Sequence, residues 1–378
     1  MKILFIIDNL CGGGAEKVLV DILNNISYEK YNIELFLIRN KGVYLDFIPH
    51  NVTVNYIYND KKYENKFIYK LYYIMTKLHF KLNRIRGLKS IFKYNLKGKT
   101  FDIYISFLEG APMQLIADSG LRGKKVAWIH TEMNKHNIMN RKKEEFVMKN
   151  MDKLVCVSQG AKKSLIEKYP YISKEIVVIN NPIDITLIEK KSKEIVMDIR
   201  RGEIPIFIAI GRIETVKGYD LLLEAHRRII KEGFIHKVFI VGEGSERKYL
   251  EKLTREYGVE ESFKFIGFKS NPYKYLKLAD YYVMPSRYEG YPLSLCEAIA
   301  LEKPIICSDF ESANEILLDG NLGLIFKRED INDLVKSMKR LLIDKELVSK
   351  LKNNCGEKKL TLSFKNNIKK IENILECK

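Results

Sequence analysis

Two glutamates separated by seven residues, Glu289 and Glu297, flank a short loop that runs into a predicted helix. Pro292 suits the first helical position, because its ring sets φ and it has no N–H that would need an acceptor. The backbone amides of Gly290–Ser294 then lie at the positive end of the helix, where phosphate binds readily. Acids on both sides of a phosphate site indicate a ligand with a central phosphate and hydroxyls at both ends, as in a nucleotide-sugar. Taken alone, the same spacing also fits a surface loop with two solvated glutamates.

Two cations in another loop could serve the same ligand. Arg212 and Lys217 follow the predicted strand Ile204–Ile210, and the predicted helix Tyr219–Lys231 begins directly after them. Arginine presents a planar fork to phosphate and lysine presents a point charge, so both could contact one diphosphate. The alternative is a solvated turn after a strand.

A glycine run and a histidine are the candidate contacts in the first half of the chain. Gly12–Gly14 follow a predicted strand over residues 1–8 and precede a helix over 15–25, which is how a doubly wound α/β domain begins. The glycines allow close backbone approach to a ligand, although a tight turn explains them equally well. His130 directly follows the predicted strand 125–129. Ligands bind at the carboxyl ends of strands in open α/β sheets, but a histidine there can also be a structural hydrogen-bonding group.

These residues lie on loops of a chain in which predicted strands and helices alternate, which indicates an α/β fold. Asn180–Asp184 has the composition of a chain reversal, so an N-terminal domain over residues 1–182 and a C-terminal domain over 183–358 are expected. Residues 185–203 read as charged and irregular. Further strands are expected at 33–39, 52–57, 102–106, 153–157, 176–179, 237–241, 263–266, 280–284, 305–307 and 324–326.

The composition fits a soluble chain of two domains. The sequence has 378 residues, of which 46% are hydrophobic, and no apolar run reaches the roughly 18 residues of a membrane span. Residues 1–7 resemble a signal peptide only briefly, because Asp8 ends the apolar run, and we expect a buried strand there. The six cysteines form no C-x-x-C pair and no metal-ligand spacing, which suits a reducing cytoplasm.

The net charge of +17 is concentrated in residues 61–99, which hold twelve Lys or Arg and one acid, Glu64. Such a surface indicates an anionic partner: membrane lipid, lipid diphosphate or nucleic acid. Apolar residues recur at helical spacing over 63–97, with lysines on another face, as in interfacial helices. A helix packed on its own domain with a solvated lysine face is the alternative. The apolar positions are Phe67, Leu71, Ile74, Met75, Leu78 and Leu82, and the lysines are Lys66, Lys70, Lys77 and Lys81.

The stretch S-x-x-E-G-x-P-x-x-x-x-E-A at 286–298 resembles the signature of the retaining glycosyltransferases of the glycosyl transferases group 1 family. The resemblance implies a GT-B fold, in which two Rossmann-like doubly wound parallel-sheet domains face each other across a cleft. It also implies that residues 359–378 return to the N-terminal domain as a helix. The chain departs from the family at Glu302, where glycine is usual, and at Ser312–Glu315. Other similar motifs are Gly-Gly-Ala-Glu at 13–16, the strand-end histidine at 130, G-R-x-x-x-x-K-G at 211–218 and G-x-G at 242–244.

By this resemblance, Glu297 holds the ribose hydroxyls, and Glu289 faces the donor sugar. His130 lies near the donor sugar and the acceptor, and backbone near Phe268 meets the nucleobase. The expected catalytic residues are His130, Glu289, Arg212 and Lys217. The expected donor-binding residues are Gly13, Gly14, Arg212, Lys217, Gly242, Phe268, Glu289, Gly290, Tyr291, Pro292, Leu293, Ser294 and Glu297, and Glu16 is a candidate acceptor contact or loop-positioning contact.

Glycosyl transfer must stabilise an oxocarbenium-like sugar and a leaving nucleoside diphosphate. Many glycosyltransferases neutralise that leaving group with a metal held by Asp-x-Asp, and this sequence contains no such motif. We therefore expect Arg212, Lys217 and the helix end before Pro292 to neutralise it without a metal. No carboxylate is clearly placed as a covalent nucleophile. The family is retaining, and its proposed route, in which the leaving phosphate accepts the acceptor's proton, is adopted by resemblance.

The expected activity is transfer of a hexose or N-acetylhexosamine from a nucleotide-sugar, with UDP favoured, to a hydroxyl of a saccharide acceptor. A lipid-linked acceptor in cell-surface polysaccharide, lipopolysaccharide or glycan biosynthesis is expected. No metal, other cofactor or nucleic acid partner is expected. The enzyme would be cytoplasmic and contact the inner face of the plasma membrane through residues 61–99. A nucleotide-sugar 2-epimerase of the same architecture and a basic nucleic-acid-binding protein are the alternatives, although no stacking module is apparent.

Overall fold

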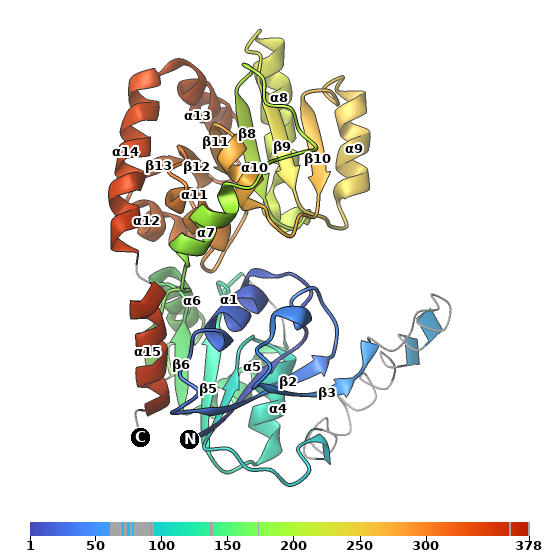
Figure 1. The fold of residues 1–378 in the computed structure, drawn as a ribbon, viewed down its shortest axis with the longest axis vertical. Helices are drawn as coiled ribbons and strands as arrows, with labels where there is room; N and C mark the ends of the chain where they lie inside the picture. The colour runs from blue at the N-terminus through green and yellow to red at the C-terminus, as the bar shows by residue number, and fades with distance from the viewer. Residues whose placement is uncertain are drawn as a thin grey trace. The chain divides into compact units, whose positions relative to one another are not determined.

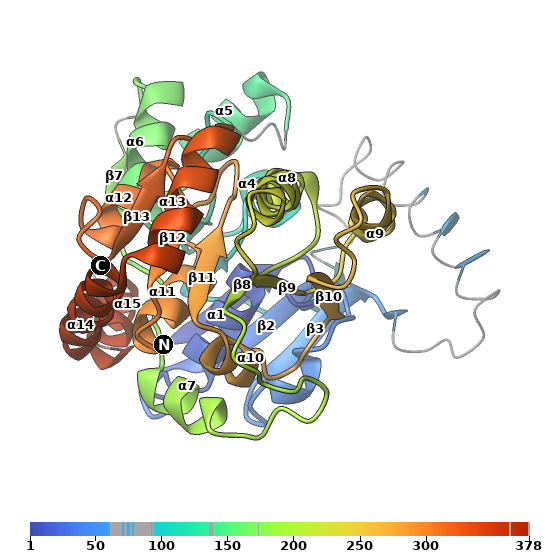
Figure 2. The ribbon, with the colours of Figure 1, turned by 90° about the horizontal axis from the view of Figure 1, so that it is seen from above.

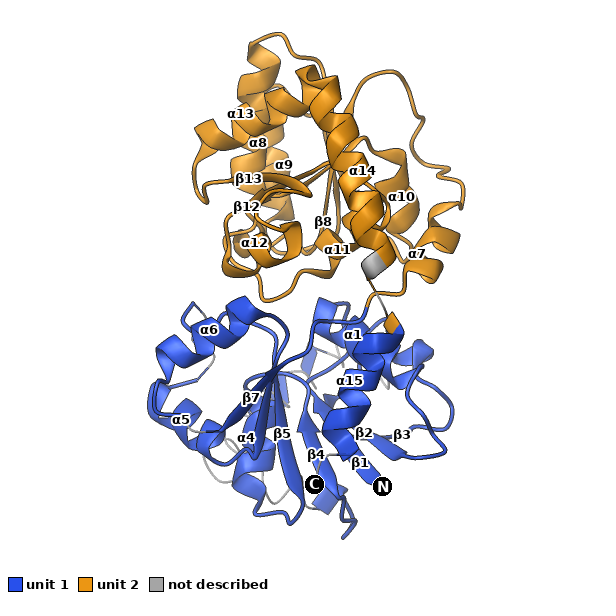
Figure 3. Ribbon diagram, turned by 90° about the vertical axis from the view of Figure 1, so that its left-hand side faces the viewer, with its two compact units in different colours: residues 1–182, 365–378 blue, residues 183–364 orange. Residues whose placement is uncertain are grey.

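The structure is a computed structural model that describes residues 1–60, 70–71, 74–75, 78, 92, 94–135, 139–172, 174–362 and 364–376. The chain divides into two compact units (Figure 3). Unit 1 comprises residues 1–182 together with 365–378, and unit 2 comprises residues 183–364.

Unit 1 contains a sheet whose described strands lie in the order β3-β2-β1-β4-β5-β6-β7, with all neighbours parallel (Figure 1). The central strand, β1 (Lys2–Ile7), is buried from Ile3 to Ile7, as expected for a parallel strand covered on both faces. The other strands are β2 (Asn32–Arg39), β3 (Thr53–Tyr58), β4 (Ile103–Ser106), β5 (Lys124–Ile129), β6 (Lys153–Cys156) and β7 (Glu175–Val178).

Alternate residues of β1 serve opposite faces of this sheet. Leu4 and Ile6 belong to a core cluster with Met113, Val147 and Leu165, which come from three helices on one side. The helices up to residue 182 that the structure describes are α1 (Gly14–Leu23), the 3-10 helix η1 (Leu45–Phe47), α4 (Ala111–Ser119), α5 (Arg141–Lys149) and α6 (Gln159–Lys168).

The last described helix, α15 (Phe364–Glu376), belongs to unit 1 although it follows unit 2 in the chain. Its Glu372 accepts a hydrogen bond from the Ser27 amide at 3.2 Å, and Glu376 accepts one from the Tyr31 hydroxyl at 2.8 Å. The preceding helix α14 (Lys345–Thr361) ends later than the expected domain limit at residue 358. The apolar face of α15 is buried through Ile368, Ile371, Ile374 and Leu375.

Unit 2 contains a second parallel sheet, with its described strands in the order β10-β9-β8-β11-β12-β13. Figure 2 shows these strands side by side across the unit. The order reverses between β8 and β11, and in open α/β sheets such a reversal creates a crevice at the carboxyl ends of the two strands. The strands are β8 (Ile206–Ile210), β9 (Lys237–Val241), β10 (Phe263–Gly267), β11 (Tyr281–Met284), β12 (Ile305–Ser308) and β13 (Gly323–Phe326).

Helices cover both faces of this second sheet and form two separate cores. One core joins α8, α9 and α13 to the sheet, and the other joins α7, α10, α11 and α12 to it. The described helices are α7 (Ile185–Ser192), the 3-10 helix η3 (Thr215–Lys217), α8 (Tyr219–Lys231), α9 (Arg247–Glu256), α10 (Tyr273–Leu278), α11 (Leu293–Ala300), α12 (Glu311–Leu317), α13 (Ile331–Ile343) and α14.

The expectation of an irregular segment over 185–203 is wrong for its first half, because α7 forms there. The Asp184 carboxylate accepts a hydrogen bond from the Leu187 amide at 2.9 Å and caps the helix. Ile188 is buried and Ile185 packs against the same core, so these apolar contacts and the cap order a charged stretch.

Two doubly wound parallel sheets confirm the predicted α/β fold class. Within the described ranges no helix is both long and apolar enough to span a membrane. Most of the predicted amphipathic helix, including Phe67, Lys66, Lys77, Lys81 and Leu82, lies outside the described residues. The described positions within it at 70–71, 74–75 and 78 are helical.

Candidate active site

The crevice of unit 2 brings together two of the predicted motifs. Lys217 lies at the end of η3, after β8, and Glu289 lies in the loop after β11. The Lys217 Nζ is 2.6 Å from the Glu289 Oε1, and the same oxygen accepts a hydrogen bond from the Ser286 hydroxyl at 2.7 Å. Both charged side chains are less than one-fifth exposed, at 18% and 15%, so their attraction is less screened than at the surface.

The helix that follows Glu289 begins one residue later than the sequence predicts. Pro292 is the residue before α11 and not its first residue, because its ψ of 115° is extended. The amides of Leu293 and Ser294 open the helix and have no acceptor within it. A hydrogen bond of 2.8 Å from the buried Tyr282 hydroxyl to the Ser294 Oγ holds this first turn against β11. The helix end is therefore a fixed donor group beside the ion pair.

The side chains of Tyr291 and Leu293 pack against the core of unit 2. Burial raises the pKa of the Tyr291 hydroxyl, which is hydrogen-bonded to the Cys296 thiol. Both side chains are therefore engaged with the protein, and the role expected of the backbone amides stays a prediction.

Glu297 lies on α11 and is 5% exposed. Its Oε1 accepts a hydrogen bond of 3.2 Å from the Tyr273 hydroxyl, which comes from α10. A buried carboxylate that is partly satisfied in this way is held in one orientation. Tyr273 was not anticipated, because nothing in the local sequence around residue 273 links it to residue 297.

The loops that carry Arg212 and Gly242 are pressed together. A Cβ at Gly242 would lie 1.9 Å from the Gly211 carbonyl oxygen, so only glycine permits this approach. The Gly211 amide donates to the Val241 carbonyl at 3.0 Å. Arg212 is exposed, and the described part of the chain offers its guanidinium no ion-pair partner. Its charge is therefore available at the same strand end as Lys217.

Phe268 follows β10 and is 50% exposed. An exposed aromatic ring next to a strand end is compatible with a nucleobase contact. The predicted contact of Phe268 with the nucleobase and the predicted contact of Gly290 with the donor both stay predictions.

In unit 1 the glycine loop is organised by Glu16. The Glu16 Oε2 accepts hydrogen bonds from the amides of Gly12 at 2.6 Å and Gly13 at 2.5 Å, while Gly14 is the first residue of α1. Burial, together with the charge of Glu16, raises the pKa of Asp8 to about 6. The geometry gives Glu16 a loop-positioning contact, and its contact with an acceptor stays a prediction.

His130 directly follows β5 and is a neutral imidazole. Burial lowers the pKa of His130 to about 3, and the ring is hydrogen-bonded to the Phe107 carbonyl. Its Nε2 is buried and has no hydrogen-bond partner among the described residues. An orphan ring nitrogen at a strand end is a candidate contact for a ligand hydroxyl.

Glu109 holds the backbone around His130. Its Oε1 accepts hydrogen bonds from the His130 amide at 2.5 Å, the Thr131 amide at 2.9 Å and the Thr131 hydroxyl at 3.1 Å. Glu109 follows β4, which neighbours β1 at the order reversal of this sheet. The sequence reasoning missed Glu109, although its place at a strand end was a usable signal.

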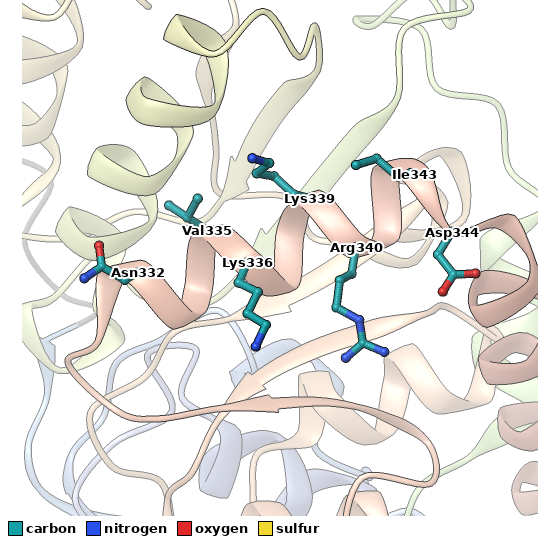
Figure 4. A pocket seen from close by; sticks show the side chains of 7 residues that line it. All are labelled: Asn332, Val335, Lys336, Lys339, Arg340, Ile343 and Asp344. Atoms are coloured by element: carbon teal, nitrogen blue, oxygen red, sulfur yellow. The ribbon is translucent and has the colours of Figure 1, made fainter.

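A hollow of about 460 Å³ lies away from these motifs, along the exposed side of α13. Figure 4 shows that its side chains fan out in two directions and do not converge on one point. No group of acidic, histidine or cysteine side chains in the described part of the chain could hold a metal ion. The hollow is lined by Asn332, Val335, Lys336, Lys339, Arg340, Ile343 and Asp344.

The fold and the crevice of unit 2 define a GT-B glycosyltransferase. The family description "Glycosyl transferases group 1" matches residues 193–358, and "Glycosyltransferase Family 4" matches residues 12–187. The second half of the chain matches the glycosyl transferases group 1 family, and the two matches together confirm the resemblance seen in the sequence.

Similar proteins agree with this assignment. The chain is 26% identical over 93% of both chains to N-acetylgalactosamine-N,N'-diacetylbacillosaminyl-diphospho-undecaprenol 4-alpha-N-acetylgalactosaminyltransferase of Campylobacter jejuni. It is 26% identical over 57% of both chains to UDP-Gal:alpha-D-GlcNAc-diphosphoundecaprenol alpha-1,3-galactosyltransferase of Escherichia coli. The fold is similar to that of Anabaena HepE in complex with UDP-glucose, with a TM-score of 0.78, 16% identity and 99% of each chain covered.

Proposed function

We propose that this enzyme transfers a sugar, with retention of anomeric configuration, from a UDP-sugar to a lipid-linked saccharide in cell-surface glycan assembly. The observation that carries the proposal is the 2.6 Å contact between the Lys217 Nζ and the Glu289 Oε1. A cation and an acid at one strand end, next to a helix N-terminus, suit a diphosphate joined to a hydroxyl-bearing sugar. Two of the similar proteins are named for acceptors that contain a diphospho-undecaprenol group, and one is named for a UDP-sugar donor.

In this proposal, cationic side chains and the helix end neutralise the leaving diphosphate without a metal. Lys217 and the exposed Arg212 supply positive charge, and the amides of Leu293 and Ser294 supply oriented donors. Glu297 holds the ribose, and Glu289 orients the sugar. The leaving phosphate accepts the proton of the acceptor hydroxyl, so no separate covalent nucleophile is required.

In this proposal, His130 of unit 1 is the contact for an acceptor hydroxyl. Because its imidazole is neutral at physiological pH, its orphan Nε2 can accept a hydrogen bond from a sugar hydroxyl without carrying charge. This role orients a substrate and transfers no proton.

The proposal includes a peripheral contact with anionic membrane through residues 61–99. Four of the described apolar positions there, within residues 71–78, have the helical spacing i, i+3, i+4 and i+7, so they share one face. They are strongly exposed, which is unusual for four neighbouring apolar side chains. Their exposures are 55% for Leu71, 49% for Ile74, 63% for Met75 and 58% for Leu78.

The donor assignment is tested by thermal shift with UDP-sugars, with and without EDTA, followed by transfer assays. The wild-type protein should be stabilised by a UDP-sugar equally in EDTA, and Glu297→Ala should lose the response. Glu260→Ala, which changes an exposed glutamate of the same unit, is the matched control. A response that disappears in EDTA would contradict the metal-free proposal. Release of an epimerised sugar without an acceptor would favour the epimerase instead.

The membrane contact is tested by sedimentation with vesicles that contain phosphatidylglycerol. Replacement of Lys66, Lys70, Lys77 and Lys81 by glutamine should release the protein from these vesicles, because charge attracts such a segment to anionic lipid. Unchanged sedimentation of the variant would remove these lysines from the membrane contact.

A further inference from the structure

The two loops that carry Lys217 and Glu289 are joined by a third side chain, Arg287. Its backbone amide donates to the Val216 carbonyl at 2.8 Å, and its guanidinium donates to the Thr215 carbonyl. Both acceptors belong to the turn that ends in Lys217. Arg287 itself lies two residues before Glu289, so one residue holds both loops at once.

The guanidinium of Arg287 also contacts two carboxylates that lie outside the two loops. It donates to the two carboxylate oxygens of Asp220, in the first turn of α8, at 2.9 and 2.7 Å. It donates to the Glu329 Oε1 at 2.7 Å. A fork bound to two acids and a carbonyl has its donors occupied by protein, so Arg287 is not a ligand for the diphosphate.

The backbones of the two loops are in direct contact. Gly218, at φ 65°, follows Lys217, and a Cβ at this position would lie 2.1 Å from the Pro285 carbonyl oxygen. The loops therefore touch directly at Gly218 and are tied at Arg287. Between these two points, the distance from Lys217 to Glu289 is determined by the protein and not by a ligand.

We propose that Arg287 is a positioning residue: it sets the spacing between Lys217 and Glu289, so that a diphosphate and the attached sugar find both groups already in place. This inference rests on the proposed roles of Lys217 and Glu289. Its physical basis is preorganisation, because a side chain that is fixed before binding costs less entropy to use. The simpler reading is an ion pair that only stabilises unit 2, and exposed pairs of that kind contribute little.

A second arginine of unit 2 provides a matched control. Arg201 also donates to one carboxylate, that of Asp280, through its Nη2 at 2.8 and 3.0 Å, and its Nη1 donates to the Ile204 carbonyl at 3.1 Å. Like Arg287, it contacts a carboxylate and a backbone carbonyl, but it touches neither loop of the site. Arg287→Lys and Arg201→Lys therefore both remove a guanidinium bound to a carboxylate and a carbonyl, but only Arg287→Lys removes one that joins the two loops of the site.

The test measures binding of UDP, GDP, CDP and ADP, and of the matching nucleoside, by titration calorimetry, with the melting temperature recorded for each variant. Arg287→Lys should weaken binding of the preferred nucleoside diphosphate about tenfold, while Arg201→Lys should change it by less than about twofold. Binding of the nucleoside should be unaffected in both variants, since it does not use Lys217. In the Lys217→Ala background, Arg287→Lys should have almost no further effect, because residues that act through one another are not additive.

The outcomes separate the inference from the function on which it rests. If Lys217→Ala loses diphosphate binding but Arg287→Lys behaves like Arg201→Lys, the inference alone is overturned. Additive losses in the double variant would also overturn it. If Lys217→Ala binds normally, or if the wild-type protein binds none of the four diphosphates, both the proposed function and the inference fail.

Discussion

Lys217 and Glu289 neutralise each other at an Nζ to Oε1 distance of 2.6 Å, at the carboxyl ends of the strands β8 and β11. In the proposed donor complex each group has a separate ligand atom to contact, a phosphate oxygen for the lysine and a sugar hydroxyl for the glutamate. Donor binding then exchanges one ion pair for two contacts, and no bare charge needs to be buried beforehand.

Lys217→Ala should lower kcat/KM by a factor of 10²–10³, or roughly 3 kcal/mol of barrier, as when a preorganised donor to a developing anion is lost. Steady-state transfer assays measure this change. Lys248→Ala, at an exposed lysine of the same unit, should leave the rate unchanged. A Lys217→Ala enzyme with a normal rate would exclude this lysine from leaving-group stabilisation.

Tyr273→Phe should weaken nucleotide binding by about five- to tenfold. The substitution removes the hydrogen bond to the Glu297 Oε1, which is worth roughly 1 kcal/mol, and leaves a buried carboxylate freer to rotate. Calorimetry with a nucleoside diphosphate measures the change. Tyr249→Phe, at a tyrosine that is 55% exposed, is the control. Equal affinities of the two variants would show that Tyr273 does not orient the carboxylate.

Glu109→Ala should reduce kcat as strongly as His130→Ala. Without the carboxylate, the amides of His130 and Thr131 lose a shared acceptor, and the strand end that aims the imidazole is released. Transfer assays on both single variants and the double variant test this coupling, with circular dichroism to verify folding. The double variant should be no slower than either single one, and a well-folded Glu109→Ala enzyme with normal kcat would contradict the assignment.

Unit 2 should lose stability as the pH falls, because of a buried histidine pair. The His226 Nδ1 lies 2.8 Å from the His236 Nε2. The His226 ring packs against Phe263, and the His236 ring packs against Phe207. Burial, with a smaller contribution from His236, lowers the pKa of His226 to about 3, so the ring stays neutral in the folded state.

The unfolded chain binds a proton at His226 near its ordinary pKa of 6.5 and the folded one does not, so stability is complete above that pH and is lost progressively below it. At pH 5 the loss from His226 is on the order of 2 kcal/mol. Urea unfolding at pH 7.5 and 5.0 measures it, and His226→Gln should shrink the difference between the two pH values. A difference that does not shrink would mean that His226 is protonated in the folded protein.

Much of the fold could be predicted from local patterns. The bounds of α8 agree with the predicted helix 219–231, because Gly218 and an amphipathic run mark both its start and its course. The helix α7 was not predicted, since its formation depends on the Asp184 cap and on burial of Ile188 against elements far away in sequence. Charge patterns alone do not reveal such contacts.

The proposed ligand-binding residues could be found because they belong to short motifs, while the residues that orient them could not. Tyr273 reaches Glu297 across 24 residues, Glu109 reaches His130 across 21, and Arg287 reaches Asp220 across 67. These contacts depend on which strands become neighbours in the sheets, and local sequence patterns do not reveal that strand order.

The placement of α15 in unit 1 affects the order in which the protein can be completed during synthesis. Residues 364–376 emerge from the ribosome only after every residue of unit 2 that precedes them, yet they bury Ile368, Ile371, Ile374 and Leu375 and satisfy the Ser27 amide. Unit 1, which is translated first, therefore lacks α15 until synthesis reaches residue 376. Unit 2 is complete before α15 has been made. Nascent chains stalled before residue 364 should consequently expose an apolar face on the earlier half, where a chaperone can bind.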